Sequence, residues 1–258
     1  MTIQGKIAVV TGASSGIGRA LAVELGLRGA RVVIAARSAE KLAETAAILN
    51  GYGIEHLSIP FDITAESSIK NLIATIKREC GSVDIFVNNA GVGLFENIVD
   101  STQKDMDAVF ETNFWGPLNI LQHIVPTMSG GMVVNISSAA AKYAPYQQGV
   151  YAASKAALER MTEALGIEQK NIKTLLVIPD RTDTPFMKHV VGPREKATLA
   201  LQLKFSPAEA VAKKIARAIE KEKSVCYPTL KARIYALLSA LAPGLVKAII
   251  TKTIPKNV

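Results

Sequence analysis

The stretch KIAVVTGASSGIG, residues 6–18, joins a short apolar run to a glycine-rich turn. The run is continuously apolar rather than alternating, as expected of a strand that is covered on both faces. Gly12, Gly16 and Gly18 follow it directly and open a helical pattern. Glycine permits a tight turn there, and its bare backbone lets amide groups and the helix N-terminus approach a pyrophosphate. The spacing differs from the usual G-x-G-x-x-G fingerprint, but its place between strand and helix predicts a dinucleotide phosphate site.

The same alternation continues along the chain. Further apolar runs predict strands at residues 31–36, 55–60, 83–88, 131–137 and 173–178, with an edge strand at 224–228. Helical composition lies between them, at residues 17–28, 39–49, 65–79, 102–128 and 150–168. A last helix is predicted at 207–222, with Ser206 as its N-cap and Pro207 at its first position. The pattern predicts an α/β fold: a Rossmann-type doubly wound parallel sheet of about seven strands, flanked by helices.

Two segments interrupt this alternation. Residues 180–205 form a long irregular insert, and residues 229–258 form an apolar tail with scattered basic residues. Pro243 and Gly244 divide the tail into two helical pieces of about a dozen residues, each too short to cross a bilayer. We therefore expect a C-terminal helical extension that either covers a subunit neighbour or the substrate cleft, or lies in a membrane surface.

Composition excludes several classes of protein. Of 258 residues, 49% are hydrophobic and 20% are charged, which is ordinary globular usage. The formal net charge of +8 favours polyanionic ligands, acidic partners or anionic membranes. Aromatic residues make up only 5% and are not interleaved with basic runs, so nucleic acid is not expected. Cys80 and Cys226 form no CxxC motif, which favours a reducing compartment and argues against a metal site. Without a signal peptide or a long apolar segment, a cytoplasmic protein is expected.

The end of the second predicted strand reads AARSAEKL, with Ala36, Arg37 and Ser38 after the apolar run. Enzymes that prefer NAD tend to place Asp or Glu about 20 residues after the glycine turn, where it binds the ribose 2′-hydroxyl. A carboxylate would repel the additional phosphate of NADP, whereas an arginine can bind it with two hydrogen bonds. Arg37 therefore predicts NADP, although a surface arginine in a loop would look the same.

The stretch VYAASKAALERM, residues 150–161, places Tyr151 and Lys155 four residues apart in a predicted helix. Such positions are neighbours on one helix face, and an ammonium group beside a phenol favours the phenolate. The pair suits a tyrosine that exchanges a proton near neutral pH. Taken alone, the spacing also fits two solvated side chains.

Over about residues 5 to 228 these motifs together resemble the short-chain dehydrogenase/reductase family. TGASSGIG at 11–18 is similar to its cofactor turn, NNAG at 88–91 to its second signature, and YAASK to its Tyr-x-x-x-Lys pair. Asn113 falls where the family carries a helix-bending asparagine, and Asp62 where a residue faces the adenine. Ser138 lies thirteen residues before Tyr151, a spacing that favours it over Ser137 as the active-site serine, although a one-residue slip would exchange them.

The resemblance implies a reaction and a set of site residues. Tyr151 would deliver a proton to a carbonyl oxygen while NADPH delivers hydride to the carbon. Lys155 would lower the tyrosine pKa and hold the nicotinamide ribose. Ser138 would stabilise the developing alkoxide, and Asn113 would position a water between Lys155 and solvent. The implied cofactor residues are Gly12, Ser14, Ser15, Gly16, Ile17, Gly18, Arg37, Asp62, Ile63, Asn89, Ala90, Gly91, Tyr151, Lys155, Pro179 and Thr184.

One position departs from the family. After the sixth strand the family usually has Pro-Gly, and then a threonine that meets the nicotinamide carboxamide. Here IPDRTDTPF keeps Pro179 and has Thr184 at the threonine position, but Asp180 replaces the glycine. Asp180 either adds bulk and charge beside the substrate or is a turn residue, since Asp tolerates unusual φ.

An apolar pocket predicts a hydrophobic carbonyl substrate, such as a long-chain, steroid-like or acyl-thioester compound. Its expected lining is Val92, Leu94, Phe95, Tyr143, Pro145, Tyr146, Phe186, Met187, Val190 and Val191, some of which would instead form the core of a lid.

The sequence thus predicts an NADPH-dependent reductase with a catalytic domain at 1–228 and the extension at 229–258, assembled as a homodimer or homotetramer. One alternative is a 3-oxoacyl thioester reductase that docks an acidic carrier protein on its basic surface. Another is a non-catalytic NADP(H) sensor or membrane-bound scaffold, which would be free to lose Tyr151 or Lys155.

Overall fold

A parallel β-sheet forms the centre of the computed structural model, which describes residues 1–192 and 205–252. Within these ranges seven strands pair in the order β3-β2-β1-β4-β5-β6-β9, and every pairing is parallel. The predicted doubly wound sheet is confirmed. The strands are β1 (Ile7–Thr11), β2 (Arg31–Ala36), β3 (His56–Pro60), β4 (Ile85–Asn88), β5 (Gly131–Ile136), β6 (Ile172–Val177) and β9 (Val225–Cys226).

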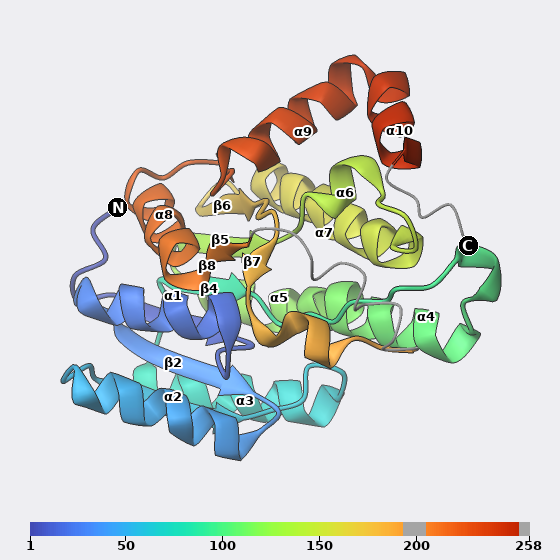
Figure 1. The fold of residues 1–258 in the computed structure, drawn as a ribbon. Coiled ribbons are helices and arrows are strands. Elements are labelled where there is room, and N and C mark those ends of the chain that lie inside the picture. Colours follow the sequence, from blue (N-terminus) through green and yellow to red (C-terminus); the bar gives the residue numbers. More distant parts are fainter. Residues whose placement is uncertain (193–204, 253–258) are drawn as a thin grey trace.

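Helices cover both faces of this sheet (Figure 1). One face carries α1 (Gly16–Leu27), α2 (Ala39–Gly51) and α8 (Ala208–Glu220). The other carries α3 (Glu66–Cys80), α5 (Gly116–Ile124) and part of α7 (Gly149–Glu168). Successive residues of β1 and β2 enter the two cores in turn, which is why the interiors of these strands, residues 8–10 and 32–36, are continuously apolar. The remaining helices are α4 (Gln103–Phe110), α6 (Ala140–Tyr143), α9 (Leu230–Leu241) and α10 (Pro243–Lys252).

The helix predicted at 102–128 is interrupted. It consists of α4, a π-helical turn at Glu111–Trp115, α5 and a short 3-10 turn at Val125–Thr127. Asn113 lies inside the π-helical turn, and π-turns often mark functional sites. The family's helix-bending asparagine therefore coincides with a π-helical turn inside a continuous helical segment.

The predicted start of the helix at 207–222 is wrong. Ser206 and Pro207 form the short strand β8, which pairs in parallel with β7 (Thr182–Asp183). The backbone amide of Ser206 donates to the carbonyl of Arg181, and no side chain caps α8. A β-pairing between the two ends of the insert has thus replaced the local cap.

The C-terminal extension folds back onto the domain beside α6 (Figure 1). Ala232 of α9 is fully buried in a small core with Ala139, Leu176 and Ile178. Pro243 opens α10, so the expected division into two helices is confirmed. In the described ranges, no helix is long and apolar enough to cross a membrane. The domain boundary at residue 228 stays a prediction.

Candidate active site

A cleft of about 360 Å³ lies at the carboxyl ends of the strands, where β1 and β4 are neighbours and the chain winds away in opposite directions. This switch point is the usual ligand position in doubly wound sheets. Every predicted cofactor residue lines the cleft except Gly18. Ser138, Tyr151 and Lys155 line it as well, whereas Asn113 lies behind the wall.

Close backbone packing explains the glycines of the turn. Gly12 and Gly16 have φ of +65° and +55°, in the left-handed region that glycine tolerates. A Cβ on Gly12 would lie 2.8 Å from the Cα of Ala90, and one on Gly16 would lie 2.9 Å from Cγ2 of Thr184. Gly18 is buried, and a Cβ there would collide with Asn89 Nδ2 and the carbonyl of Gly12. It therefore serves the packing of the turn rather than the lining of the cleft.

Thr11 and Asn89 hold the turn against β4. The Asn89 Nδ2 donates to the carbonyl oxygens of Thr11 and Gly12 over 3.0 and 3.2 Å. The backbone amides of Asn89 and Ala90 donate to Thr11 Oγ1 over 3.0 and 3.2 Å. Sequence reasoning did not assign Thr11 a role, although it directly precedes the first glycine of the motif.

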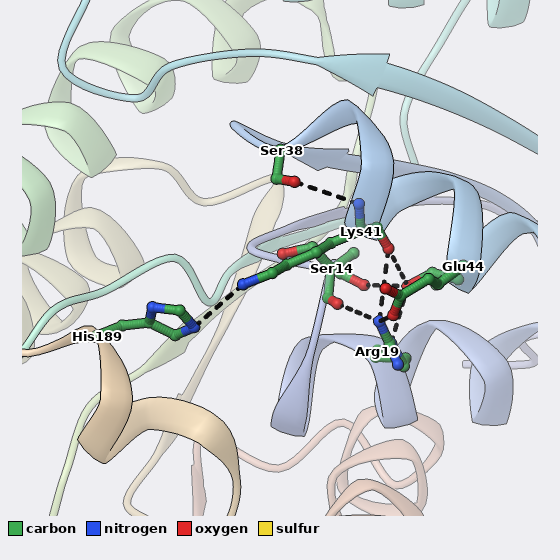
Figure 2. Close-up of polar contacts among 8 residues, drawn as sticks. Ser14, Arg19, Ser38, Lys41, Glu44 and His189 are labelled. Carbon is green, nitrogen blue, oxygen red and sulfur yellow. Dashed lines mark hydrogen bonds and ion pairs between the residues drawn. The ribbon is translucent and has the colours of Figure 1, made fainter.

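Basic residues line the cleft where β2 ends, and Figure 2 shows one of them, Lys41, pointing toward His189. Arg37 is exposed, and Lys41, which sequence reasoning missed, lines the cleft one helical turn further on. Ser38 caps α2 by accepting from the backbone amide of Lys41. The Lys41 Nζ lies 3.4 Å from Nε2 of His189, so helix α2 contacts the insert across the cleft.

Arg19, on α1, is hydrogen-bonded to groups of the protein itself. Its Nη2 donates to the carbonyl of Ser14 over 2.5 Å and to Glu44 Oε2 over 2.7 Å. The carboxylates in the described lining are Asp62 and Asp180. Asp62 accepts from both the amide and the hydroxyl of Thr64, which fixes it at the start of the loop after β3. The end of β2 thus presents cations rather than a carboxylate.

Tyr151 and Lys155 lie on α7 with 8% and 4% of their surface exposed. Burial raises the pKa of Tyr151 to about 12, opposed by a hydrogen bond with Ser138. Burial lowers the pKa of Lys155 to about 8. In the protein alone the pKa of Tyr151 is therefore raised by burial, whereas the resemblance implied that Lys155 would lower it. Lys155 instead donates its Nζ proton to the carbonyl of Ile136 over 3.0 Å.

Asn113 is tied to the wall behind this pair. Its Oδ1 accepts from the amide of Val92, and its Nδ2 donates to the carbonyl of Val92 and to Ser154 Oγ, over 2.9 to 3.0 Å. A Cβ on Gly91 would lie 3.1 Å from Asn113 Oδ1 and 3.2 Å from Lys155 Nζ. The absence of a side chain at Gly91 therefore lets Asn113 Oδ1 and Lys155 Nζ both lie close to its backbone.

The two serines after β5 face different partners. Ser138 is hydrogen-bonded to Tyr151 and lines the cleft, and its Oγ accepts from the amide of Ala140 over 3.1 Å. Ser137 Oγ donates to the buried carboxylate of Glu159 over 2.8 Å. Glu159 also pairs with Lys142 over 2.5 Å. The geometry therefore places Ser138 beside the tyrosine, as the thirteen-residue spacing favoured.

Asp180 meets the C-terminal extension. Its carboxylate, 10% exposed, lies 4.0 Å from Lys231 Nζ on α9. Burial, together with the nearby charge of Asp180, raises the pKa of Tyr143 to about 12. The ring of Tyr143 packs 5.0 Å from that of Tyr235, also on α9. Asp180 does not have a positive φ, so its backbone does not need the tolerance of a turn residue.

Part of the predicted apolar lining belongs to the insert's own packing. Leu94 and Val191 form a β-bridge, and Val190 packs on Phe95. Tyr146 is not part of the described lining. The Phe186 ring lies 5.7 Å from that of Tyr151, which places an apolar wall directly beside the phenol. The expected residues that do line the cleft are Val92, Phe95, Tyr143, Pro145, Phe186 and Met187. The insert residues 193–204 lie outside the described ranges.

The glycine turn and the cleft at the strand switch point define a Rossmann-type nucleotide-binding protein. The sequence model of the short chain dehydrogenase family matches residues 6–195. The chain belongs to this family of oxidoreductases.

Individual relatives agree with this assignment. An uncharacterized oxidoreductase of Bacillus subtilis, YxnA, is 33% identical over 258 residues, which cover 97% of this chain and 72% of the relative. A short chain dehydrogenase/reductase of Burkholderia phymatum, solved with NAD, has a TM-score of 0.88 at 24% identity, covering 95% of this chain and 96% of its own. A short chain dehydrogenase of Burkholderia cenocepacia, solved with NADP, has a TM-score of 0.83 at 24% identity, covering 99% and 100%. At this identity the two structures support the fold.

Proposed function

We propose that the protein is an NADPH-dependent carbonyl reductase that transfers hydride between NADP(H) and a carbonyl or secondary alcohol. The main support for this proposal is that one cleft is lined by two groups of residues. Ser138, Tyr151 and Lys155 lie at one part of it, and Arg37 and Lys41 lie where β2 ends. Proton-transfer groups and a cationic site for an additional phosphate are thus joined by the glycine turn.

The residues present fit a dinucleotide. Gly12, Gly16 and the residues between Ala13 and Gly18 that line the cleft present their backbone to it, and the N-terminus of α1 follows immediately. When bound, NADPH supplies the hydride. The N-terminus of α1 would hold the pyrophosphate, Asp62 would face the adenine, and Thr184, beside Gly16, would hold the carboxamide.

The protein's own groups manage the proton. Tyr151 is protonated at neutral pH, since its pKa is about 12, and so has a proton to donate to the carbonyl oxygen. Ser138 would donate a hydrogen bond to the same oxygen as charge develops there. Lys155 is largely protonated at pH 7, since its pKa is about 8. Its ammonium would stabilise the phenolate that remains after proton transfer.

The proposed preference for NADP over NAD rests on charge. Arg37 and Lys41 line the end of β2, and the carboxylates of the described lining, Asp62 and Asp180, belong to other segments. A 2′-phosphate would meet two cations here, whereas NAD would leave them without an anionic partner.

The apolar wall formed by Val92, Phe95, Phe186 and Met187 favours a hydrophobic substrate. Cys80 and Cys226 are free thiols, which supports a reducing, cytoplasmic setting. We also expect a homodimer or homotetramer, as the family resemblance implies.

A substrate screen tests the proposal. Ketones, aldehydes and 3-oxoacyl thioesters are incubated with NADPH, and its loss of absorbance is followed. We expect turnover of apolar ketones or aldehydes, with NADH far less effective. Selective turnover of thioesters presented on a carrier protein would favour a reductase of fatty-acid synthesis instead. NADPH binding without turnover of any compound would contradict an enzyme and favour a sensor.

A further inference from the structure

The outward side of the C-terminal helices is apolar. On α9 the exposed aliphatic residues are three or four positions apart, so they share one side of the helix. Their exposed fractions, and those of two aliphatic residues on α10, run from 37% to 75%. Contiguous exposed apolar surface of this kind marks an interaction site. The outer apolar face, as we call it, consists of Leu230, Ile234, Leu237, Leu241, Leu245 and Ile249.

The opposite side of these helices is fixed to the domain. At about 100° per residue, Ala232 lies on the far side of α9 from Leu230 and Leu241. Ala232 is fully buried, and Val246 on α10 is 3% exposed. The inner side of α9 also packs through Tyr235 onto Tyr143. Leu230 and Leu241 therefore lie on the side of α9 opposite its buried contact, and α9 and α10 both lie at the periphery of the domain beside α6 (Figure 1).

The charge of this segment has a single sign. From residue 223 to the end of the sequence there is no Asp or Glu, while the segment has six basic residues: Lys223, Lys231, Arg233, Lys247, Lys252 and Lys256. On the helix wheel Lys231 and Arg233 flank the apolar residues of α9, one on each side, and Lys231 is the one that also lies near Asp180 of the domain. Long basic side chains beside an apolar face place their charges at the level of lipid phosphates.

We propose that the outer apolar face binds an anionic lipid surface, with α9 and α10 lying in the headgroup layer. The two helices, 12 and 10 residues long, are about 18 and 15 Å in length, too short for the roughly 30 Å hydrocarbon core. A second copy of the chain fits this face less well. A two-fold contact would bring like charges together, and the segment has no carboxylate to pair with them. The binding is independent of the reaction proposed above.

Vesicle sedimentation of the full-length protein tests this inference. The probes are phosphatidylcholine vesicles with and without a minority of phosphatidylglycerol. We expect binding to the anionic vesicles that weakens as salt is raised. The double variant Leu237→Gln/Leu241→Gln should bind at least about tenfold more weakly, because two exposed aliphatic side chains are lost. The matched control is Ile167→Gln on α7, which removes a 79% exposed aliphatic residue elsewhere and should bind like wild type.

Three outcomes would overturn the inference. Equal binding to both kinds of vesicle would exclude anionic lipid as the partner. Absence of sedimentation, together with a change of oligomeric mass in the double variant alone, would make the face a subunit interface. Absence of sedimentation with capture of an acidic carrier protein, lost in the double variant, would make it a protein-docking site. Because the double variant changes exposed positions only, its melting temperature and NADPH affinity should match wild type.

Discussion

Replacing Lys142 with Met should leave the buried carboxylate of Glu159, which lies behind Ser137, without its cationic partner. The carboxylate of Glu159 is 3% exposed and lies 2.5 Å from Lys142 Nζ, whose side chain is 22% exposed. Its second oxygen accepts from Ser137 over 2.8 Å. Without the lysine, one neutral hydroxyl would remain to support a buried carboxylate.

The expected cost follows from this burial. Removing one partner of a buried ion pair typically costs 3–5 kcal/mol of the free energy of unfolding. Because Lys142 reaches solvent, we take the lower end, about 3 kcal/mol. For a protein of this size that corresponds to a melting temperature roughly 6–12 °C lower. The double variant Lys142→Met/Glu159→Gln removes both charges and keeps an acceptor for Ser137, so it should recover about 2 kcal/mol.

Urea unfolding of the four proteins in this cycle measures the coupling directly. The control is Lys70→Met, which breaks an exposed pair with Glu66 of similar length, 2.6 Å, and should cost less than about 1 kcal/mol. A cost below about 1 kcal/mol for Lys142→Met, or no recovery in the double variant, would show that Lys142 does not stabilise the buried carboxylate of Glu159. Either result would mean that water, rather than the lysine, supports the carboxylate of Glu159.

Three further predictions concern charge around the cleft. Arg37→Asp should lower kcat/KM for NADPH about 100-fold and reverse the preference over NADH, since charge-assisted hydrogen bonds to the phosphate give way to repulsion. Arg78→Asp on α3 is its control, and equal wild-type efficiency with both cofactors would contradict the idea. Asp180→Gly should change the substrate range or pH–rate profile more than the melting temperature, because Asp180 lines the cleft; a change in melting temperature alone would make it a structural residue. Lys155 has a pKa of about 8 in the folded protein against 10.5 unfolded, so the unfolded state binds more protons between these values and stability must rise with pH there. Relative to Lys155→Met, the wild type should gain about 2 kcal/mol of unfolding free energy from pH 8 to 10, measured by urea titration, and parallel curves would exclude the shift.

The fold could be predicted from the sequence because its local sequence signals agree with the tertiary structure. The strands buried on both faces read as continuous apolar runs, and Gly12 and Gly16 occupy positions where a Cβ would collide or strain the backbone. Tyr151 and Lys155 were predictable as a pair because helical spacing alone makes them neighbours.

The remaining features depend on contacts between distant segments, which spacing does not encode. Ser206 reads as a local cap, but it pairs with Thr182 across the insert. The contact between Lys41 and His189 joins α2 to the insert, two segments far apart in the sequence. The contact between Asp180 and Lys231 likewise joins segments that no motif connects.

The pKa of Tyr151 is a second property that the sequence alone does not predict. A neighbouring ammonium predicts a lower value, but the sequence does not report how deeply the phenol is buried, and burial raises it to about 12. A tyrosine that stays protonated until substrate and cofactor arrive is suited to act as an acid.

In the proposed reaction Tyr151 delivers the proton while NADPH supplies the hydride. The most direct measurement compares single-turnover rates and NADPH affinity for Tyr151→Phe and for the control Tyr52→Phe, which alters a 62% exposed tyrosine on the surface. We expect Tyr151→Phe to slow turnover by about 10² to 10⁴-fold while NADPH binding is nearly unchanged, and the control to behave like wild type. Turnover at the wild-type rate in Tyr151→Phe would contradict this role of Tyr151.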